Sequence, residues 1–400
     1  MNCPKNPKRI LISAGELSGD EHAAGLIAAL KGYQVPFEVR GMGGANMHRE
    51  GAELTVNIEH SGSIMGFGTV LKSLPKILTA LGDLKRLIIS WKPDLVVLVD
   101  YPDFNLRLAR FAHEHAIPVL YFIPPTVWAW RKGRLELIKK YVNKAALIYP
   151  FEEKFYRDNG YDNAHFVGHP FCESITRTPP SVDERAHFLR TRGLNPDKPV
   201  VADVPGSRWG EIERHLGTVL SAIAIFNERH PDVQFAIEIA SSINREKLSA
   251  LIPDKFPGKR CGGDPVMLLR CSDAGLLKSG TSNLQAAFAG LPFCMFFLAS
   301  AFSTFIVKHF ISIKEYSIVN LIKPGTVLEL ILEKAEPENM ARELEVVLFD
   351  QERRSDLRRS LAEVVSAFQQ DSSSGASLTA YQKTAKLVQE LLLTVTETSN

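Results

Sequence analysis

The stretch DLVVLVDYPDFN, residues 94–105, sets the fold class of this 400-residue chain. Its apolar run lacks the alternation of a half-exposed strand, which indicates a parallel strand buried on both faces. Polar residues and a proline follow at once, and helical spacing continues over Phe104–His115. A buried strand that leads directly into a helix is the repeating unit of a doubly wound α/β sheet.

The same alternation occurs on both sides of this stretch. It lapses in the polar, proline-bearing segment Thr176–Lys198 and then resumes, so we predict two doubly wound domains in tandem. Ligands are then expected in a cleft beyond the carboxyl ends of the strands. A charged helical tail follows from Ala335, with a break at Ser372–Ser374. The other predicted strands are Arg9–Ser13, Pro118–Ile123, Ala145–Tyr149, Pro199–Val204, Gln234–Ala240, Asp273–Leu277 and Pro292–Phe297.

Composition excludes several classes of protein. A hydrophobic fraction of 45%, a charged fraction of 23% and a net charge of +2 are typical of a soluble globular chain and give no reason to expect a nucleic-acid partner. Five scattered cysteines without a C-x-x-C pair favour a reducing, cytoplasmic compartment. The first residues do not resemble a secretory signal. The apolar stretch Leu291–Val307 contains Pro292, so we expect a strand, a loop and an amphipathic helix there rather than a membrane span.

Two loops of the first domain carry candidate chemistry. The turn Ser13–Asp20 is rich in small residues and opens a helix, which favours an anion, although Ser18 or Asp20 as a simple helix cap is the other interpretation. Its spacing is not that of a dinucleotide fingerprint, so no such cofactor is expected. Asp100 ends a strong strand and could remove a proton from an attacking hydroxyl, with Asp103 or Asn105 as the helix cap.

In the second domain, two strand-to-helix turns fit a diphosphate. PGSR (205–208) brings an arginine, and KSGTSN (278–283) brings hydroxyls and a helix start. Neither is accompanied by a Walker lysine pattern or an Asp-x-Asp pair, so positive side chains and a helix dipole are expected to neutralise the ligand without a metal. The tryptophans of VWAWR (127–131) either stack on a sugar or base, or pack against the neighbouring helix.

Taken together, the loops resemble the lipid-A-disaccharide synthase family of GT-B-fold glycosyltransferases. The resemblance covers about residues 9 to 330 and rests on motifs in family order: AGELSGD (14–20), GMGG (41–44), SIMGFGTVLKSLP (63–75), DYPDFN (100–105), VWAWR (127–131), VGHP (167–170), PGSR (205–208) and KSGTS (278–282). It implies an inverting, metal-independent transfer of 2,3-diacylglucosamine from UDP to the 6-hydroxyl of 2,3-diacylglucosamine 1-phosphate. It also implies a role in lipopolysaccharide synthesis at the inner membrane of a Gram-negative bacterium.

The resemblance implies a role for each matching residue. Asp100 would be the general base, and Arg208 with the loop Ser279, Gly280, Thr281 and Ser282 would hold the UDP diphosphate. Asn320 falls at a functional asparagine of the family, and Glu16, Ser18 and Asp20 would line the acceptor side. The helically spaced apolar residues around 65–78 match an exposed patch that would enter the inner leaflet, although spacing alone favours an ordinary core face; they are Met65, Phe67, Val70, Leu71, Leu74, Ile77 and Leu78.

The polar stretch Thr176–Lys198 and the break at Ser372–Ser374 predict the domain limits: a first domain over 1–175, a second over 195–370 and a tail over 371–400. The resemblance implies that the first domain faces the acceptor and the membrane and that the second binds the UDP-sugar. The tail either folds back or is exchanged in a homodimer. The chain departs from the family at Gln285, where a glutamate is usual, at Leu332 and at Lys323–Gly325. Because these changes cluster on the donor side, two alternatives stay open. One is a related transferase or epimerase for another UDP-sugar, and the other is a paralogue that binds UDP-lipid without turnover.

Overall fold

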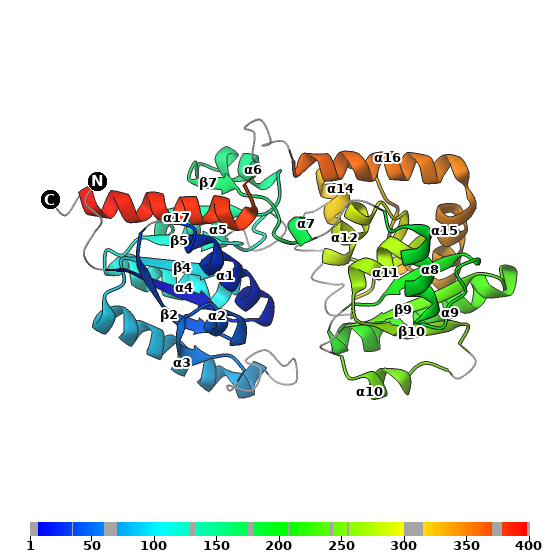
Figure 1. The fold of residues 1–400 in the computed structure, drawn as a ribbon, viewed down its shortest axis with the longest axis horizontal. Helices are drawn as coiled ribbons and strands as arrows, with labels where there is room; N and C mark the ends of the chain where they lie inside the picture. The colour runs from blue at the N-terminus through cyan, green and yellow to red at the C-terminus, as the bar shows by residue number, and fades with distance from the viewer. Residues whose placement is uncertain are drawn as a thin grey trace. The chain divides into compact units, whose positions relative to one another are not determined.

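The computed structural model describes residues 7–33, 35–59, 70–128, 133–174, 179–206, 208–240, 243–253, 256–299, 315–369 and 378–397. The chain forms two compact units, one of Met1–Glu173 with Asp371–Asn400 and the other of Ser174–Gln370 (Figure 1). The last helix therefore belongs to the same unit as the first strand.

The first unit is built on a parallel sheet that has seven strands among the described residues. The spatial order is β3-β2-β1-β4-β5-β6-β7, so the direction of winding reverses between β1 and β4. There Ala14 pairs with Val99, so the carboxyl ends of these two strands are neighbours. The strands are β1 (Lys8–Ala14), β2 (Phe37–Gly43), β3 (Glu53–Asn57), β4 (Leu95–Val99), β5 (Val119–Phe122), β6 (Lys144–Leu147) and β7 (Ala164–Phe166).

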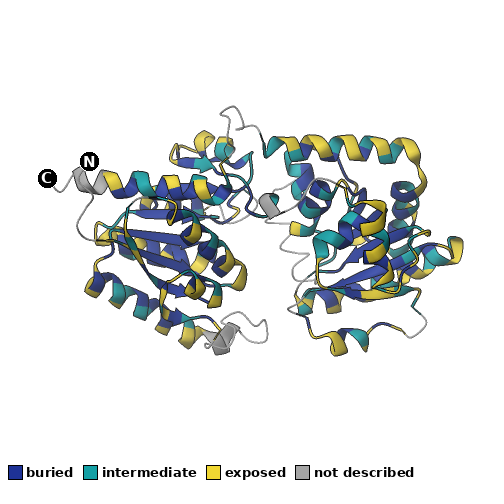
Figure 2. Ribbon diagram, in the orientation of Figure 1, coloured by how far each residue is buried: buried dark blue, intermediate teal, exposed yellow. Residues whose placement is uncertain are grey.

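Helices cover both faces of this sheet, and a hydrophobic core lies under each layer. Figure 2 shows the strands buried and the outer helix faces exposed. The C-terminal helix α17 (Ala380–Glu397) packs on α1 and fully buries Ala385 and Val388. The other helices are α1 (Leu17–Leu30), α2 (Ala45–Arg49), α3 (Val70–Trp91), α4 (Pro102–Glu114), α5 (Gly133–Tyr141), α6 (Glu152–Asp158) and α7 (Phe171–Ser174).

The second unit repeats the same topology on a parallel sheet of six described strands, ordered β10-β9-β8-β11-β12-β13. Its winding reverses between β8 and β11. The strands are β8 (Val200–Val204), β9 (Gln234–Ile239), β10 (Gly258–Gly262), β11 (Ala274–Lys278), β12 (Phe293–Phe297) and β13 (Glu329–Ile331). The helices are α8 (Val182–Arg190), α9 (Trp209–Arg229), α10 (Arg245–Ser249), α11 (Pro265–Cys271), α12 (Thr281–Ala289), α14 (Ile318–Ile322), η1 (Leu332–Lys334), α15 (Pro337–Phe349) and α16 (Gln351–Ala367).

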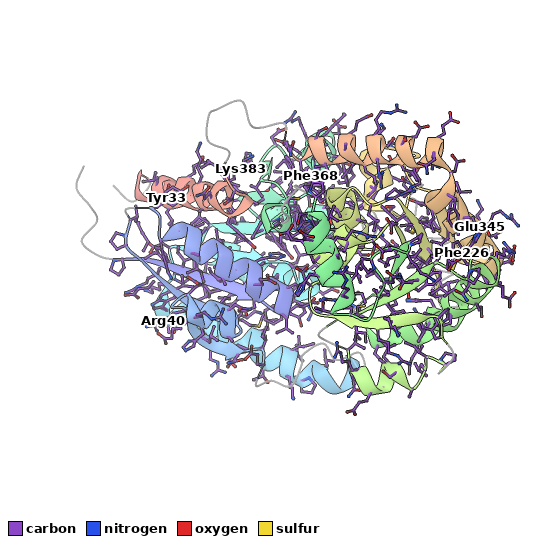
Figure 3. All side chains as sticks on the ribbon, turned by 45° about the vertical axis from the view of Figure 1, so that its right-hand side comes forward. Tyr33, Arg40, Phe226, Glu345, Phe368 and Lys383 are labelled. Atoms are coloured by element: carbon purple, nitrogen blue, oxygen red, sulfur yellow. The ribbon has the colours of Figure 1, made fainter. Side chains whose placement is uncertain are left out.

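Helix α15, which follows the last strand of the second sheet, packs against α9. The rings of Phe226 and Phe349 stack with centroids 6.3 Å apart, and Nε2 of His230 lies 3.2 Å from a Glu345 carboxylate oxygen. Figure 3 shows Phe226 and Glu345 on this side of the second unit. The region from Ala335 that sequence predicted to be helical is thus part of the second unit as far as α16.

The predicted fold class, two doubly wound parallel sheets with a helical C-terminal segment, is confirmed. All eight strands predicted from apolar runs are observed, with ends shifted by at most two residues. No helix among the described residues is long and apolar enough to cross a bilayer. Within Leu291–Val307, the expected strand is β12, and the residues after 299 lie outside the described part of the chain.

Candidate active site

Asp100 lies directly after β4, at the point where the winding of the first sheet reverses. Asp100 and the next residue, Tyr101, have φ angles of 48° and 50°. Left-handed backbone at non-glycine residues costs about 1–3 kcal/mol each, and it persists only where the surroundings hold it. The loop therefore presents a half-buried carboxylate in a fixed backbone conformation, which suits a group that has to meet a reacting hydroxyl.

The loop after β1 packs against the Asp100 loop. A Cβ atom at Gly15 would lie 2.1 Å from the Tyr101 ring, so this close approach requires glycine. Glu16, which is half-buried, contributes to raising the pKa of the Tyr101 hydroxyl, after the larger effect of burial. Ser18 is exposed. The structure thus brings Glu16 near Tyr101, the residue that follows Asp100.

Asp20 is buried, unlike Glu16 and Ser18, with which it was predicted to line the acceptor side. Its side chain is fully buried, and its carboxylate accepts hydrogen bonds from the backbone N–H groups of Gly44 (2.7 Å), Asn46 (3.0 Å) and Met47 (3.1 Å). It does not cap its own helix, because the N-cap of α1 is Glu16. Asp20 instead caps α2, and it joins the AGELSGD and GMGG segments by direct contact.

The expected cap of α4 is also wrong. The N-cap is Tyr101, and Asn105 lies inside the helix, where its amide bonds back to the loop carbonyls. Trp128 follows the packing interpretation, since its ring N–H donates to Glu152 at 3.0 Å and its ring meets Phe151 edge-on. Burial raises the pKa of Glu152 to about 7. Trp130 lies outside the described residues.

The predicted apolar patch divides into four groups. Met65 and Phe67 lie outside the described residues, and Val70 and Leu71 begin α3 with side chains that are not described. Leu74 and Leu78, one helical turn apart, are 45% and 51% exposed. Ile77 packs against the core. The start of α3 therefore presents leucines to solvent, and the core-face interpretation is wrong for Leu74 and Leu78.

In the second unit, one pocket of about 360 Å³ collects most of the predicted donor-side residues. It lies beyond the carboxyl ends of β8, β9 and β11, where the winding of the second sheet reverses. Gly206, with a φ of 104°, turns the chain from β8 toward α9 at its wall. The predicted residues that line the pocket are Arg208, Ser279, Gly280, Thr281, Ser282 and Gln285.

The pocket combines helix N-termini with charged side chains. The N-termini of α9 and α12 both adjoin it, because Arg208 is the N-cap of α9 and Gly280 that of α12. Lys278 adds a second cation and pairs with Glu211 at 2.8 Å, while Arg208 lies 3.7 Å from the same carboxylate. Helix N-termini with two cations form a site suited to phosphate oxygens.

Two acidic residues near this pocket escaped the sequence prediction. Glu238 is 7% exposed and lines the pocket, and burial raises the pKa of its carboxyl to about 7. Asp203 is fully buried in β8, and its carboxylate oxygens have no hydrogen-bond partner among the described residues. Burial, with the neighbouring Glu238, raises the pKa of Asp203 to about 8. The only sequence signal was a single acid within an apolar run of each strand.

Asn320 is 1% exposed and lies in an internal network rather than among the pocket residues. Its amide N–H groups donate to the Val327 carbonyl and to Glu329, both at 2.9 Å, and its oxygen accepts from Val327 N–H at 2.9 Å. Glu329 also accepts from the backbone N–H of Tyr316, and Ser279 donates to the Tyr316 carbonyl at 3.0 Å. Asn320 is thus linked to the pocket loop at Ser279 through Glu329 and Tyr316.

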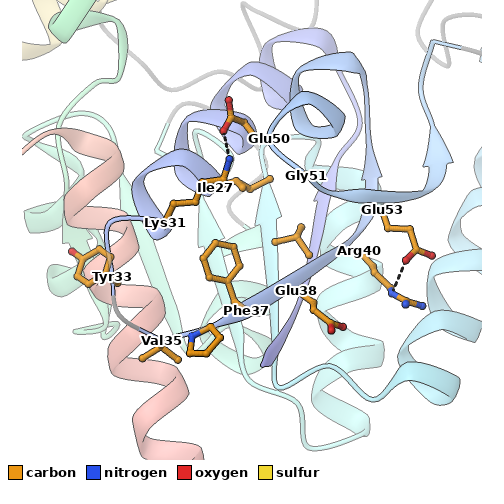
Figure 4. Close-up of a pocket in the computed structure, with 12 residues that line it drawn as sticks. Ile27, Lys31, Tyr33, Val35, Phe37, Glu38, Arg40, Glu50, Gly51 and Glu53 are labelled. Atoms are coloured by element: carbon orange, nitrogen blue, oxygen red, sulfur yellow. Dashed lines mark hydrogen bonds and ion pairs between the residues drawn. The ribbon is translucent and has the colours of Figure 1, made fainter. Parts of the chain in front are cut away.

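The first unit has a hollow of about 700 Å³ near the amino-terminal end of β2 (Figure 4). Asp100, by contrast, follows the carboxyl end of β4. Both basic side chains that line the hollow are ion-paired, Lys31 with Glu50 at 2.7 Å and Arg40 with Glu53 at 3.1 Å. It shares no residue with the predicted sites.

Comparison of the sequence with known proteins shows the family to which the chain belongs. A family model described as "Lipid-A-disaccharide synthetase" matches residues 10–383. A lipid-A-disaccharide synthase of Syntrophus aciditrophicus is 38% identical over 360 residues, covering 89% of this chain and 92% of the relative. One of Myxococcus xanthus is 36% identical over 367 residues, covering 90% and 93%. The chain belongs to the lipid-A-disaccharide synthetase family.

Solved structures of other families share the fold. UDP-GlcNAc 2-epimerase from Neisseria meningitidis, bound to UDP-GlcNAc, aligns with a TM-score of 0.61 at 13% identity, over 96% of this chain and all of its own. MurG from Acinetobacter baumannii aligns with a TM-score of 0.53 at 14% identity, over 96% of this chain and all of its own. The GT-B-like architecture of this lipid-A-disaccharide synthetase family member therefore agrees with both glycosyltransferases and epimerases.

Within the family, the departures of this chain have distinct structural settings. Gln285 lines the pocket from the second turn of α12. Leu332 begins the short helix η1 with a φ of 52°, and Lys323 pairs with Glu363 on α16. Gln285 is thus the one of the three that borders the described pocket.

Proposed function

We propose that this chain is an inverting glycosyltransferase that forms the lipid A disaccharide. The acceptor is 2,3-diacylglucosamine 1-phosphate, and the donor is UDP-2,3-diacylglucosamine. The 6-hydroxyl oxygen attacks the anomeric carbon, the bond from that carbon to the diphosphate oxygen breaks, and UDP leaves with the electron pair. The observation that carries the proposal is the pocket after β8 and β11, which collects six predicted donor residues in a chain of this family.

The second unit is the proposed donor site. Arg208 and Lys278 supply positive charge, and the N-terminus of α12 supplies backbone N–H groups, where the leaving diphosphate develops negative charge. Gln285 and Glu238 supply hydrogen-bonding side chains for the nucleoside. The pocket volume of about 360 Å³ suits the UDP part of the donor better than its diacylated sugar.

The first unit is the proposed source of the general base. Asp100 takes the proton of the 6-hydroxyl as the new bond forms, which typically contributes 10²–10⁴-fold in rate. Glu16, on the adjacent loop, and the exposed Ser18 are proposed acceptor contacts, and Asp20 acts through the loop that it caps.

The acyl chains are proposed to stay in the inner leaflet while the sugars react. The exposed leucines of α3 support this peripheral binding, because an amphipathic helix with apolar side chains toward the bilayer lies in the interface. The cytoplasmic location and a homodimer remain predictions, and α17 packs on the first unit of its own chain here.

A transfer assay with the purified full chain in detergent micelles tests the function. Donor and acceptor lipids are supplied together, singly, and with UDP-N-acetylglucosamine in place of the acylated donor. Products are identified by mass spectrometry, and UDP-sugar epimers, which have equal masses, are distinguished by proton NMR. We expect disaccharide 1-phosphate and equimolar UDP only with both lipids. Epimerised UDP-N-acetylglucosamine would instead indicate an epimerase, and UDP binding without any product would indicate a non-catalytic protein.

A further inference from the structure

We propose that Asn105 is a positioning residue for the reaction, because its amide fixes the backbone from which the Asp100 carboxylate projects. The inference rests on the proposed function, in which Asp100 is the general base. Asn105 is fully buried in the first turns of α4 and is the point at which β1, β4 and α4 are joined by side-chain hydrogen bonds.

The Asp100 carbonyl is the atom that Asn105 holds most closely. Nδ2 of Asn105 donates to it at 2.7 Å, and the hydroxyl of Tyr121, on β5, donates to the same oxygen at 2.9 Å. The Asp100 N–H donates to the Phe122 carbonyl at 3.1 Å. Both ends of the Asp100 backbone are therefore pinned, so the direction of its Cα–Cβ bond is set and only side-chain rotation remains.

The backbone needs this restraint because it is strained. Asp100 and Tyr101 are both left-handed, and no glycine at either position relieves the conformation. Asn105 acts on both residues, since its backbone N–H also donates to the Tyr101 carbonyl at 3.0 Å. Without these bonds, the loop is free to return to a commoner backbone conformation, which would redirect the carboxylate.

The Asn105 amide is itself oriented by Ser13, at the end of β1. The Ser13 hydroxyl donates to Oδ1 of Asn105 at 2.7 Å, which assigns Nδ2 to the carbonyl side. Its two N–H groups then serve three carbonyls: Asp100 at 2.7 Å, Val99 at 3.2 Å and Ser13 at 3.3 Å. An aspartate at 105 has the same shape but no N–H group, and it would repel these oxygens.

The test compares Asn105→Ala and Asn105→Asp with Asn143→Ala in the transfer assay. Asn143 is a matched control, because its side-chain oxygen also accepts a backbone bond (Val119 N–H, 2.8 Å) but lies at the other edge of the sheet. We expect both Asn105 variants to lower kcat at least about 10-fold with UDP affinity and KM within about twofold, as for lost transition-state geometry. Asn143→Ala should keep wild-type kcat.

A double-mutant cycle with Asp100→Asn separates the inference from the proposed function. If Asn105 acts through Asp100, Asn105→Ala has no further effect on kcat in the Asp100→Asn background. Additive losses, or wild-type kcat in Asn105→Ala beside an inactive Asp100→Asn, would overturn the positioning role alone. An active Asp100→Asn would overturn the base itself. If Asn105→Ala does not fold, Asn105→Asp takes its place in the cycle, because it keeps an acceptor for Ser13 and loses only the N–H donors, and wild-type kcat there would overturn the inference.

Discussion

At the scale of single residues, the charge of the proposed donor pocket depends on how Arg208 and Lys278 share the Glu211 carboxylate. Lys278 is largely buried and pairs with it at 2.8 Å, whereas Arg208 is 56% exposed and lies 3.7 Å away. Arg208 is thus the cation that can turn to a ligand at the smaller cost. A diphosphate would bind its guanidinium through two oxygens.

Arg208→Ala should weaken UDP binding by about 1.5–3 kcal/mol, the usual contribution of a charged hydrogen bond. Isothermal titration of the full chain measures this directly, and Arg214→Ala, an exposed arginine on the same helix, is the matched control. A dissociation constant that matches wild type in Arg208→Ala, or an equal loss in Arg214→Ala, would remove Arg208 from the site.

The buried Asp203 carboxyl should make the stability of the folded chain depend on pH. Its pKa is raised to about 8 in the folded chain against a usual 3.8, so the folded state keeps a proton that the unfolded state releases. Stability contributed by this group is therefore complete below pH 4 and is lost as pH rises toward 8. Asp203→Asn should raise the melting temperature more at pH 8.5 than at pH 5, by several degrees.

The control for Asp203 is Asp197→Asn, an exposed aspartate of the same unit. Its melting temperature should follow wild type at both pH values. Equal stabilities of Asp203→Asn and wild type at pH 8.5 would mean that the Asp203 carboxyl has a partner in solution.

At the scale of elements, the sequence predicts the strands that have long apolar runs but not the polar strand β10 or the short strand β13. The apolar runs of β1, β4, β5, β8 and β11 occur because both sheet faces are covered. Strand β10 (GKRCG) is at an edge, and β13 has three residues, so neither has an apolar run. The loops at the carboxyl ends of the strands followed from topology, but the Asp20 bonds to a loop 24 residues away did not.

Helix α3 carries the prediction about the membrane. The double variant Leu74→Glu, Leu78→Glu should reduce binding to vesicles of phosphatidylethanolamine and phosphatidylglycerol at least about tenfold, because both leucines are half-exposed. Flotation measures the bound fraction, and circular dichroism checks the fold. Ile89→Glu, at the other end of the same helix and 56% exposed, is the control. Unchanged binding, or equal loss in the control, would contradict a role for the start of α3.

At the scale of the whole molecule, the two units repeat one topology and have the proposed functional residues at the same topological position. Asp100 follows the strand at which the first sheet reverses its winding, and the donor pocket lies after β8 and β11, where the second sheet does so. Both loops carry motifs that the sequence analysis singled out, and their roles stay predictions. Glu238 and Asp203 were missed, because single acids within apolar strands become informative only when the fold shows what surrounds them.

The measurement that tests the account most directly is the turnover of Asp100→Asn. Asparagine tolerates the left-handed backbone at this position, so the substitution removes the charge with little cost to the fold. We predict a kcat at least about 100-fold below wild type, with UDP affinity and melting temperature unchanged. Asp103→Asn, an exposed carboxylate three residues on, should retain activity. An Asp100→Asn enzyme with near wild-type kcat would contradict the role of Asp100 as general base.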